Sequence, residues 1–501
     1  MTDLSCIVLA AGKGTRMKSD LPKVMHSIAG QPLIGHVLNS VKAIGAGEVA
    51  LVIGPDMPSI AAEAQKRALA CALAVQENRL GTGHAARIGL DALSKPSTVT
   101  IVLFGDTPLI RPETIAALAG KVADGAAVAV LGFETECPTG YGRILRNPAG
   151  QVIAIREEND ASAEEKLVTL CNSGVMAFST EVLRELLPLV GNDNAKGEYY
   201  LTDIVSLAVK RGLTVAAETC PETEVLGINN RLELSRAEAL MQSRLREAAM
   251  LAGVTMLAPE TVFLQMDTKL AADVLIEPNV VFGPGVVVET GTVIHAFSHI
   301  EGAHIGAGCQ IGPFARLRPG SDLEPKAKVG NFVEIKNAQI GGGAKVNHLS
   351  YVGDARIGGA ANIGAGTITC NYDGFDKHIT EIGAGAFIGS NSALVAPVTI
   401  AAGAYVASGS VVTDNVEPDA LAVARGRQVV KPGWAARFRA EKAAAKAAAR
   451  SNGAGVGGHP GNGTGEQDAG AVSAENGTAR SRTAAAAKPR AVAAQISGEP
   501  E

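Results

Sequence analysis

Residues 281–335 read VFGPGVVVETGTVIHAFSHIEGAHIGAGCQIGPFARLRPGSDLEPKAKVGNFVEI, and every sixth position holds Val, Ile or Leu, except for His299. The period matches neither the 3.6-residue turn of a helix nor the alternation of a strand. After shifts of one residue it continues toward the carboxyl end. The predicted inward residues are Val281, Val287, Val293, Ile305, Ile311, Leu317, Leu323, Val329, Ile335, Ile340, Val346, Val352, Ile357, Ile363, Ile382, Ile388, Leu394, Ile400, Val406 and Val412.

A sixfold repeat of this length predicts a parallel β-helix. Each hexad supplies a short strand and a turn, its aliphatic residue points into a narrow prism, and three hexads close one coil. Small residues such as Gly306-Ala307-Gly308 suit the sharp corners. The alternative is a generic sheet rich in Gly and Val, but sheets do not hold a six-residue period.

Length and composition bound the remaining possibilities. A chain of 501 residues is long enough for two or three domains with full cores, and an apolar content of 47% indicates a globular protein. The net charge of −5 gives no reason to expect nucleic acid or an anionic membrane as a partner. The amino terminus lacks the pattern of a signal peptide, and no apolar run approaches a membrane span. Seven cysteines without a CxxC pair favour reduced, buried thiols.

An α/β domain is expected at the amino terminus. Residues 4–9, LSCIVL, are typical of a buried parallel strand, and the Gly-rich turn AAGKGTRM follows at once. Such a turn can hold phosphates on its backbone N–H groups, and Arg16 and Lys23 add the cations that a triphosphate requires. The spacing fits neither the dinucleotide fingerprint nor a Walker loop. A tight turn with solvated basic residues is the alternative interpretation.

Further strands at 49–53 and 99–104, separated by Ala-rich helical stretches, predict a doubly wound parallel sheet. Asp106 follows the second strand, where α/β sheets bind ligands, and is suited to Mg²⁺. It could instead cap the helix near Pro112. The polar loop from Gln76 to His84 could contact a base edge.

Several motifs occur together and in a fixed order: LAAGKGTRM…LPKV, QENRLGTGHA, FGDTPLI, PTGYGRI, KGEYYLTD and GINNRLELS, followed by ARLRPG, VGNFVEIKNA, NHLSYVGDA and NIGAGTITCNYDG. Over about residues 4–432 the chain resembles the bifunctional UDP-N-acetylglucosamine pyrophosphorylases/glucosamine-1-phosphate N-acetyltransferases. The resemblance implies a Rossmann-like nucleotidyltransferase domain at 1–229, a linker helix at 230–252, a left-handed β-helix acetyltransferase domain at 253–433 and an Ala/Gly-rich, disordered tail at 434–501.

The resemblance also implies the first site. Uridine would be held by Leu9, Ala10, Ala11, Gly12, Gln76, Gly81 and Thr82, and Gly105 would also contact the nucleotide. Arg16 and Lys23 would bind the phosphates, and Asp106 and Asn229 would bind Mg²⁺. The sugar would be held by Gly142, Glu157 and Asn172. Uridylyl transfer from UTP needs positioning and charge neutralisation rather than a protein nucleophile. Arg79 and Phe104 depart from the family's frequent Gln and Tyr, and Ser408 stands where Ala is expected.

Residues 230–252 carry Leu234, Ala237, Met241, Leu245 and Ala248 at helical spacing. This pattern predicts an amphipathic helix that connects the two domains. A regulatory arm is the alternative.

Polar residues interrupt the β-helix at a second candidate site. The chain leaves its period at residues 369–377, TCNYDGFDK, which must loop out of the coil. An imidazole is the natural base for an amine that attacks a thioester, although His348 could also be a solvated surface residue. The resemblance makes His348 the base. It assigns Arg318, Lys336, Tyr351, Asn362 and Lys377 to sugar phosphate, and Ala365, Asn371, Tyr372, Ser390, Ser408 and Arg425 to acetyl-CoA.

The expected protein is a cytoplasmic homotrimer that acts on small molecules, with Mg²⁺ as cofactor and acetyl-CoA and UTP as co-substrates. One rival is a pyrophosphorylase for another sugar whose β-helix serves assembly or regulation; His348 and the excursion argue against it. Another is a nucleotide-sugar sensor without turnover; the intact Arg16, Lys23, Asp106 and Asn229 argue against that. AEKAAAKAAAR, within the tail, is a plausible short helix.

Overall fold

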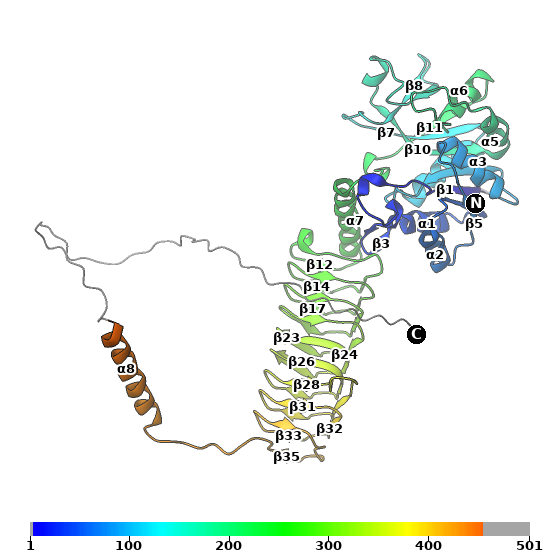
Figure 1. Cartoon of the computed structure of the whole chain (residues 1–501). Helices are drawn as coiled ribbons and strands as arrows, with labels where there is room; N and C mark the ends of the chain where they lie inside the picture. Colours follow the sequence, from blue (N-terminus) through cyan, green and yellow to red (C-terminus); the bar gives the residue numbers. More distant parts are fainter. Residues whose placement is uncertain (1–3, 454–501) are drawn as a thin grey trace, which may run out of the picture. The chain divides into compact units, whose positions relative to one another are not determined.

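The structure is a computed structural model and describes residues 4–453 (Figure 1). The chain divides into two units between Gly426 and Arg427. The disorder predicted for the tail falls mostly on residues 454–501, which lie outside the described residues. Within the predicted tail, helix α8 (Trp434–Gly453) includes the expected Ala-rich helix and begins and ends outside it.

A mixed sheet forms the amino-terminal part of the first unit, in the order β11-β7-β10-β6-β1-β4-β5. Its strands are β1 (Leu4–Leu9), β4 (Glu48–Ile53), β5 (Ala72–Val75), β6 (Val99–Phe104), β7 (Val128–Glu134), β10 (Leu170–Ser179) and β11 (Val215–Thr219). The hairpin β8 (Gly142–Arg146) and β9 (Val152–Arg156) joins β10, and β2 (Ser27–Ile28) pairs with β3 (Gln31–Pro32). β1, β4, β5 and β6 are parallel, as predicted. β10 runs antiparallel to β6 and β7, so the prediction of a wholly parallel sheet is wrong there.

Helices cover both faces of this sheet because its buried strands are apolar on both sides. Along β1, Cys6 and Val8 pack in one core and Ile7 and Leu9 in another. The first core also takes residues of α1 (Leu33–Ala43), α2 (Pro58–Lys66) and α4 (Pro112–Ala123). The second takes residues of α3 (Thr82–Ala92), α5 (Thr180–Leu186) and α6 (Asp203–Lys210). This is the predicted doubly wound arrangement.

Helix α7 (Arg231–Leu251) is the predicted amphipathic helix. Ala237 and Met241 are buried in a small core with residues of the sheet domain, and Leu245 also packs against the β-helix core. Ala248 is exposed, so its predicted place on the apolar face is wrong; Ala249 packs there instead. The helix therefore touches both parts of the first unit.

The carboxyl-terminal part of the first unit is the predicted parallel β-helix (Figure 1). Its first face is a ten-stranded sheet. The strands are β12 (Thr255–Met256), β14 (Leu275–Ile276), β17 (Val293–Ile294), β20 (Gln310–Ile311), β23 (Lys328–Asn331), β25 (Lys345–His348), β27 (Asn362–Ile363), β30 (Phe387–Ile388), β33 (Tyr405–Val406) and β35 (Leu421–Ala422).

The other two faces belong to one sheet because β24 (Glu334–Ile340) and β26 (Tyr351–Ile357) turn a corner and contribute to both. The second face comprises β15 (Val281–Phe282), β18 (His299–Ile300), β21 (Arg316–Leu317), the starts of β24 and β26, β28 (Ile368–Cys370), β31 (Ala393–Val395) and β34 (Val411–Val412). The third comprises β13 (Lys269–Leu270), β16 (Val287–Val288), β19 (Ala303–Ile305), β22 (Ser321–Leu323), the ends of β24 and β26, β29 (Thr380–Ile382) and β32 (Val398–Ile400).

The predicted frame of inward residues is correct from Ile305 onward and wrong by one position before it. In strands β15, β16, β17 and β18 the buried residues are Phe282, Val288, Ile294 and Ile300. Val281, Val287 and Val293 are only half-buried, and His299 is exposed. Three of these short strands hold two adjacent apolar residues, and β18 follows them in register. The periodicity therefore does not show which residue of each strand points inward. His299 is therefore no exception to the pattern.

Candidate active sites

A pocket of about 430 Å³ lies at the carboxyl ends of β1 and β6. The strand β1 delivers the Gly-rich turn to this edge of the sheet, where parallel α/β folds bind ligands. The pocket gathers most of the predicted nucleotide residues from four separate motifs. Its lining includes Leu9, Ala10, Ala11, Gly12, Arg16, Lys23, Gln76, Gly81, Thr82 and Asp106. Gly105 is not part of the lining, but its backbone N–H donates to the carbonyl of Leu9.

Two cations of this pocket contact the two predicted metal ligands. The Lys23 ammonium forms an ion pair with the Asp106 carboxylate and lies 3.2 Å from Asn229 Oδ1. Arg16 donates to the same Asn229 oxygen at 3.0 Å. Asp106 does not cap α4, whose N-cap position is Arg111, so the capping alternative is wrong. Residues far apart in sequence thus form one charged cluster.

Asn229 is held by the start of α7. The N-cap Asn230 accepts from the backbone N–H groups of Leu232 and Glu233. In return, the Glu233 carboxylate accepts from the backbone N–H of Asn229 at 2.6 Å. The two bonds to Asn230 satisfy N–H groups that a helix start leaves free, and the Glu233 bond anchors the residue before the cap. It also points Asn229 toward Lys23 and Arg16.

The chemistry of Asp106 and Asn229 suits a hard divalent cation. Their oxygens already converge on one positive group, the Lys23 ammonium, and carboxylate and amide oxygens are ligands that Mg²⁺ takes. In residues 4–453, no cluster of three His, Cys, Asp or Glu side chains could enclose a metal. A Mg²⁺ ion here would complete its shell with water and substrate phosphates.

Gly142, Glu157 and Asn172 lie together, as predicted. Gly142 pairs with Asn172 across β8 and β10, and a Cβ at residue 142 would lie 3.4 Å from Glu157 Oε1. Thr202 Oγ1 donates to Glu157 Oε1 at 3.2 Å. Burial raises the pKa of Glu157, and the Thr202 bond opposes that effect. The charged form of Glu157 is therefore stabilised by a neighbouring hydrogen-bond donor, Thr202.

Five residues that the sequence did not assign also line the nucleotide pocket. They are Val24, Arg79, Ala85, Phe104 and Glu198. Arg79 Nε donates to the Ala11 carbonyl at 2.6 Å. The arginine that stands in place of the family's frequent Gln therefore makes a structural contact. Phe104 packs against Gly174, where a Cβ would come within 2.8 Å of the ring. Glu198 belongs to the motif KGEYYLTD, which was the available signal for it.

His348 ends β25 on the first face of the β-helix. Its Nδ1 lies 3.0 Å from Asn331 Oδ1, on the preceding coil. Because an amide oxygen only accepts, Nδ1 carries the proton and Nε2 keeps its lone pair in the neutral ring. Sequence reasoning missed Asn331, although it lies in the motif VGNFVEIKNA.

A column of predicted acetyl-CoA residues continues from His348 along successive coils. Backbone N–H groups of the next coil donate to the carbonyls of His348, Ala365 and Ser390. Arg425 donates from its guanidinium to the Ser408 carbonyl at 2.8 Å. Since neighbouring strands lie about 4.8 Å apart, the column offers an extended track rather than a compact pocket.

Four predicted sugar-phosphate residues gather at the second face and the excursion. Electrostatic interactions link Tyr351 to both Arg318 and Lys377, and link Lys336 to Lys377. Arg318 also pairs with Glu334 at 2.8 Å, which raises the pKa of Arg318. Gly353 makes room for the Tyr351 ring, because a Cβ there would lie 2.4 Å from the hydroxyl. The fifth residue, Asn362, lies on the first face with His348.

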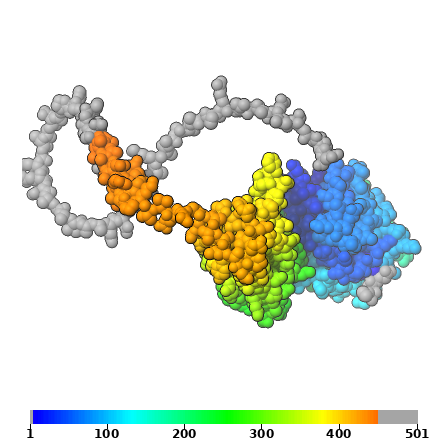
Figure 2. Space-filling model, turned by 90° about the horizontal axis from the view of Figure 1, so that it is seen from below, coloured from blue at the N-terminus to red at the C-terminus, as the bar shows by residue number. Residues whose placement is uncertain are grey.

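The predicted excursion leaves the coil at Asn371 and stands out as a yellow projection in Figure 2. Asp373 accepts from the backbone N–H groups of Phe375 and Asp376, both at 2.8 Å, and bonds to His378. These bonds lower the pKa of Asp373. Asp373 is thus a structural residue of the projection, and Phe375 is exposed at its tip.

Comparison with known proteins shows the family of the chain. The model of the MobA-like NTP transferase domain matches residues 6–197. The bifunctional protein GlmU of Azorhizobium caulinodans is 58% identical over 439 residues, which cover 88% of this chain and 98% of that protein. GlmU of Agrobacterium fabrum is 54% identical over 446 residues, covering 89% and 98%. GlmU of a Chelativorans species is 55% identical over 456 residues, covering 90% and 100%.

A nucleotidyltransferase domain followed by a β-helix places the chain in the class of two-domain nucleotidyltransferases. The extent of these matches then shows that the chain belongs to the GlmU family of bifunctional proteins. It is a uridylyltransferase and an acetyltransferase. No helix within residues 4–453 is both long and apolar enough to cross a membrane.

Proposed function

We propose that the protein makes UDP-N-acetylglucosamine in two steps. Residues 253–433 transfer acetyl from acetyl-CoA to glucosamine 1-phosphate. Residues 1–229 then transfer uridylyl from UTP to the N-acetylglucosamine 1-phosphate and release pyrophosphate. The product supplies peptidoglycan and lipopolysaccharide precursors, and a cytoplasmic location fits co-substrates made there. The seven cysteines are free thiols, which suits a reducing compartment.

The observation that carries the uridylyl step is the convergence of Lys23 and Arg16 on Asp106 and Asn229. The oxygen of the sugar phosphate attacks the α-phosphorus of UTP, and the bond to pyrophosphate breaks. Arg16 and Lys23 neutralise the phosphates, and Lys23 turns from Asp106 toward them when nucleotide binds. Backbone groups from Leu9 to Gly12, with Gln76, Gly81 and Thr82, orient the uridine. Catalysis is then positioning and charge neutralisation.

Asp106 and Asn229 would hold the Mg²⁺ ion. The bound ion would supply positive charge at the phosphate oxygens. The sugar is held by Glu157, Asn172 and Gly142 on the side of the α-phosphorus opposite the leaving pyrophosphate. The sugar phosphate then attacks in line with the bond that breaks.

For acetyl transfer, His348 Nε2 takes a proton from the glucosamine amine as the nitrogen attacks the thioester carbonyl. The C–N bond forms, the C–S bond breaks, and the CoA thiolate leaves. Asn331 keeps the proton on Nδ1 and thereby the lone pair on Nε2. The column of Ala365, Ser390, Ser408 and Arg425 holds acetyl-CoA, while Asn371 and Tyr372 contact it from the projection.

The acetyltransferase site supports a homotrimer. His348 and Asn362 lie on the first face, whereas Arg318, Lys336 and Tyr351 lie on the second, so a neighbouring copy could bring the two groups together. A row of stacked rings, Phe297, Phe314 and Phe332, follows the corner between these faces. All three are exposed, with centroid spacings of 4.9 and 5.1 Å. Because the row repeats with the coils, another β-helix with a parallel axis matches its period.

Replacing both Phe314 and Phe332 with Ser should weaken assembly. Covering one Phe side chain is worth about 1.5–3 kcal/mol, so losing both from each interface lowers the association constant of that interface by roughly 10²–10⁴-fold. Sedimentation equilibrium should show dissociation at concentrations where the wild type stays assembled. Acetyl transfer should fall with the assembled fraction and uridylyl transfer should persist.

The matched control is Leu189→Ser, which removes an exposed apolar side chain from the sheet domain. It should leave assembly unchanged. A fully active acetyltransferase that sediments as a monomer would contradict the shared site.

Removal of the chain after Gly433 should leave both activities within a few-fold of the full chain. In helix α8, residues 434–449 are all exposed, so none of them belongs to a hydrophobic core whose loss would destabilise the protein. Separate assays of CoA release and pyrophosphate release check this. A large loss of acetyl transfer would instead show that α8 covers the CoA track.

One coupled assay tests the proposed function as a whole. Purified protein is given glucosamine 1-phosphate, acetyl-CoA, UTP and Mg²⁺, and free thiol and pyrophosphate are measured separately. Both should appear, with pyrophosphate dependent on acetyl-CoA when glucosamine 1-phosphate is the only sugar. Pyrophosphate release without any thiol release would favour a uridylyltransferase whose β-helix serves assembly alone.

A further inference from the structure

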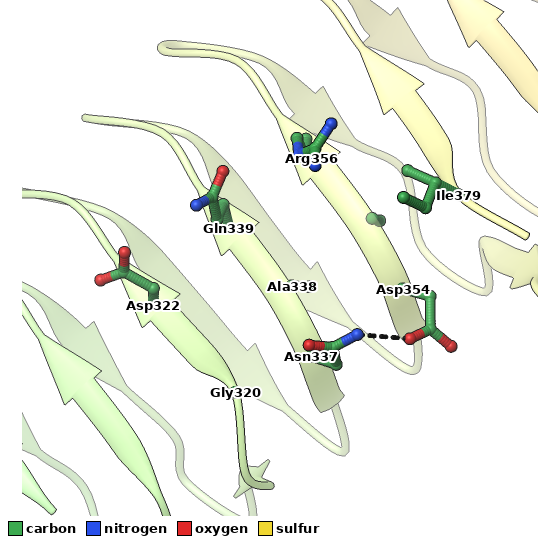
Figure 3. A pocket seen from close by; sticks show the side chains of 9 residues that line it. Gly320, Asp322, Asn337, Ala338, Gln339, Asp354, Arg356 and Ile379 are labelled. Carbon is green, nitrogen blue, oxygen red and sulfur yellow. Dashed lines mark hydrogen bonds between the residues drawn. The ribbon is translucent and has the colours of Figure 1, made fainter.

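Asp354 is a buried carboxylate at the corner between the second and third faces, only 7% exposed. Asn337 on the preceding coil donates to its Oδ1 at 2.6 Å, a bond drawn in Figure 3. Its other oxygen accepts from the Asn371 amide, where the projection begins. The carboxylate therefore connects three consecutive coils. Its backbone φ of 47° is unusual for an aspartate.

A buried charge is costly unless other groups compensate it. The two asparagine amides satisfy the carboxylate oxygens but bring no net charge. Burial would raise the pKa of Asp354, but the Asn337 and Asn371 bonds and the charges of Lys336 and Lys377 together lower it. The carboxylate is thus compensated by the two lysines that the proposed function assigns to sugar phosphate.

Those two lysines are also neighbours of each other. Hydrogen bonding with Lys336 and repulsion from it lower the pKa of Lys377, and the charge of Asp354 opposes that effect. Two adjacent ammonium groups repel unless negative charge lies close to both. In the free protein Asp354 supplies such charge, and a sugar phosphate would supply more.

We propose that Asp354 is a positioning residue for acetyl transfer. Through Asn371 it fixes the start of the projection, residues 371–378, so that Asn371 and Tyr372 contact acetyl-CoA. Through its charge it keeps Lys336 and Lys377 together beneath the sugar phosphate. The inference rests on the proposed acetyltransferase function, and Asp354 itself need not touch either substrate.

The test compares Asp354→Asn with the wild type in the full-length protein. The variant keeps the shape of the side chain but loses its charge and one acceptor. The KM values for acetyl-CoA and for glucosamine 1-phosphate should each rise about 10-fold, as for the loss of a supporting partner of a site residue. The kcat should change less than the KM values, and uridylyl transfer should stay within about two-fold of wild type.

Hydrogen exchange provides a readout that does not depend on activity. The backbone N–H of His378 donates to the Asn371 carbonyl at 2.9 Å and closes the projection. In Asp354→Asn, amides of residues 371–378 should exchange faster while those of β27 and β30 remain protected. The matched control is Asp322→Asn. Asp322 and Asp354 both line the surface pocket drawn in Figure 3, but the Asp322 carboxylate is exposed and bonds to His304. It should change neither exchange nor KM.

Two outcomes would overturn the inference. One is unchanged exchange and unchanged KM values in Asp354→Asn. The other is an equal effect from Asn337→Gly, which removes the second partner of Asp354 without touching the projection, because Asp354 would then act on coil stability alone. If even the wild type transfers no acetyl, the proposed function fails, while the exchange comparison still decides whether Asp354 anchors the projection.

Discussion

Asp106→Ala should lower pyrophosphate release by at least about 100-fold, since loss of a mere supporting partner of a metal ligand already costs 10–100-fold. Asp106 and Asn229 are the proposed ligands of Mg²⁺, and their oxygens converge on the Lys23 ammonium. Loss of the Asp106 carboxylate would remove the charged ligand of the ion whose positive charge the developing pyrophosphate needs. Acetyl transfer should stay nearly intact, because the acetyltransferase residues lie on the β-helix.

Measuring UTP binding to Asp106→Ala distinguishes a catalytic role of Asp106 from a role in binding the nucleotide. Without the carboxylate, the Lys23 ammonium loses its ion-pair partner and is free for phosphate, so UTP should still bind to Asp106→Ala. Asp91→Asn, an exposed acid on α3, is the matched control and should leave both activities unchanged. Equal loss of thiol and pyrophosphate release in Asp106→Ala would contradict separate sites.

His348→Ala should have the opposite profile and lower acetyl transfer about 10²–10⁴-fold, as expected for a lost general base. Uridylyl transfer from supplied N-acetylglucosamine 1-phosphate should not change. The physical reason is the Asn331 contact to Nδ1, which leaves Nε2 as the proposed proton acceptor. Initial rates of thiol release and of pyrophosphate release, measured separately, check the prediction.

The matched control for His348 is His299→Ala, an exposed histidine on β18 of the same β-helix. It should retain full thiol release. Asn331→Ala should lie between the control and His348→Ala, because the ring remains but its tautomer is no longer held. Thiol release at the wild-type rate in His348→Ala would remove this residue from the mechanism.

Much of the first site could be predicted because its motifs are local. The end of β1 and the turn after it carry Leu9 to Gly12 on consecutive residues. Strand and turn patterns therefore place them at a ligand-binding edge, and the family resemblance assigns them to uridine. Arg79 was visible only as a departure from a family motif. Its bond to the Ala11 carbonyl joins two loops that the sequence does not relate. The same holds for Arg16 and Asn229, which meet only after the sheet and α7 have formed.

The β-helix shows where periodicity stops being informative. Its hexads predicted the architecture, but not the first inward frame, because strands such as Val287–Val288 offer two apolar residues. Packing in the prism selected Val288. The pattern also could not predict that β10 is antiparallel to its neighbours, since an apolar strand has the same composition in either direction.

By itself, the sequence determined the β-helix, the strand and turn that hold nucleotide, and the two sets of transferase motifs, because each is written in short or repeated stretches. Tertiary structure alone decided which frame faces the core and which polar side chains meet: Lys23 with Asp106, Asn331 with His348, and Asp354 with Asn337 and Asn371. Such pairs join residues on different strands, coils or loops. Their distances depend on the packing of the whole domain, and no local pattern encodes them.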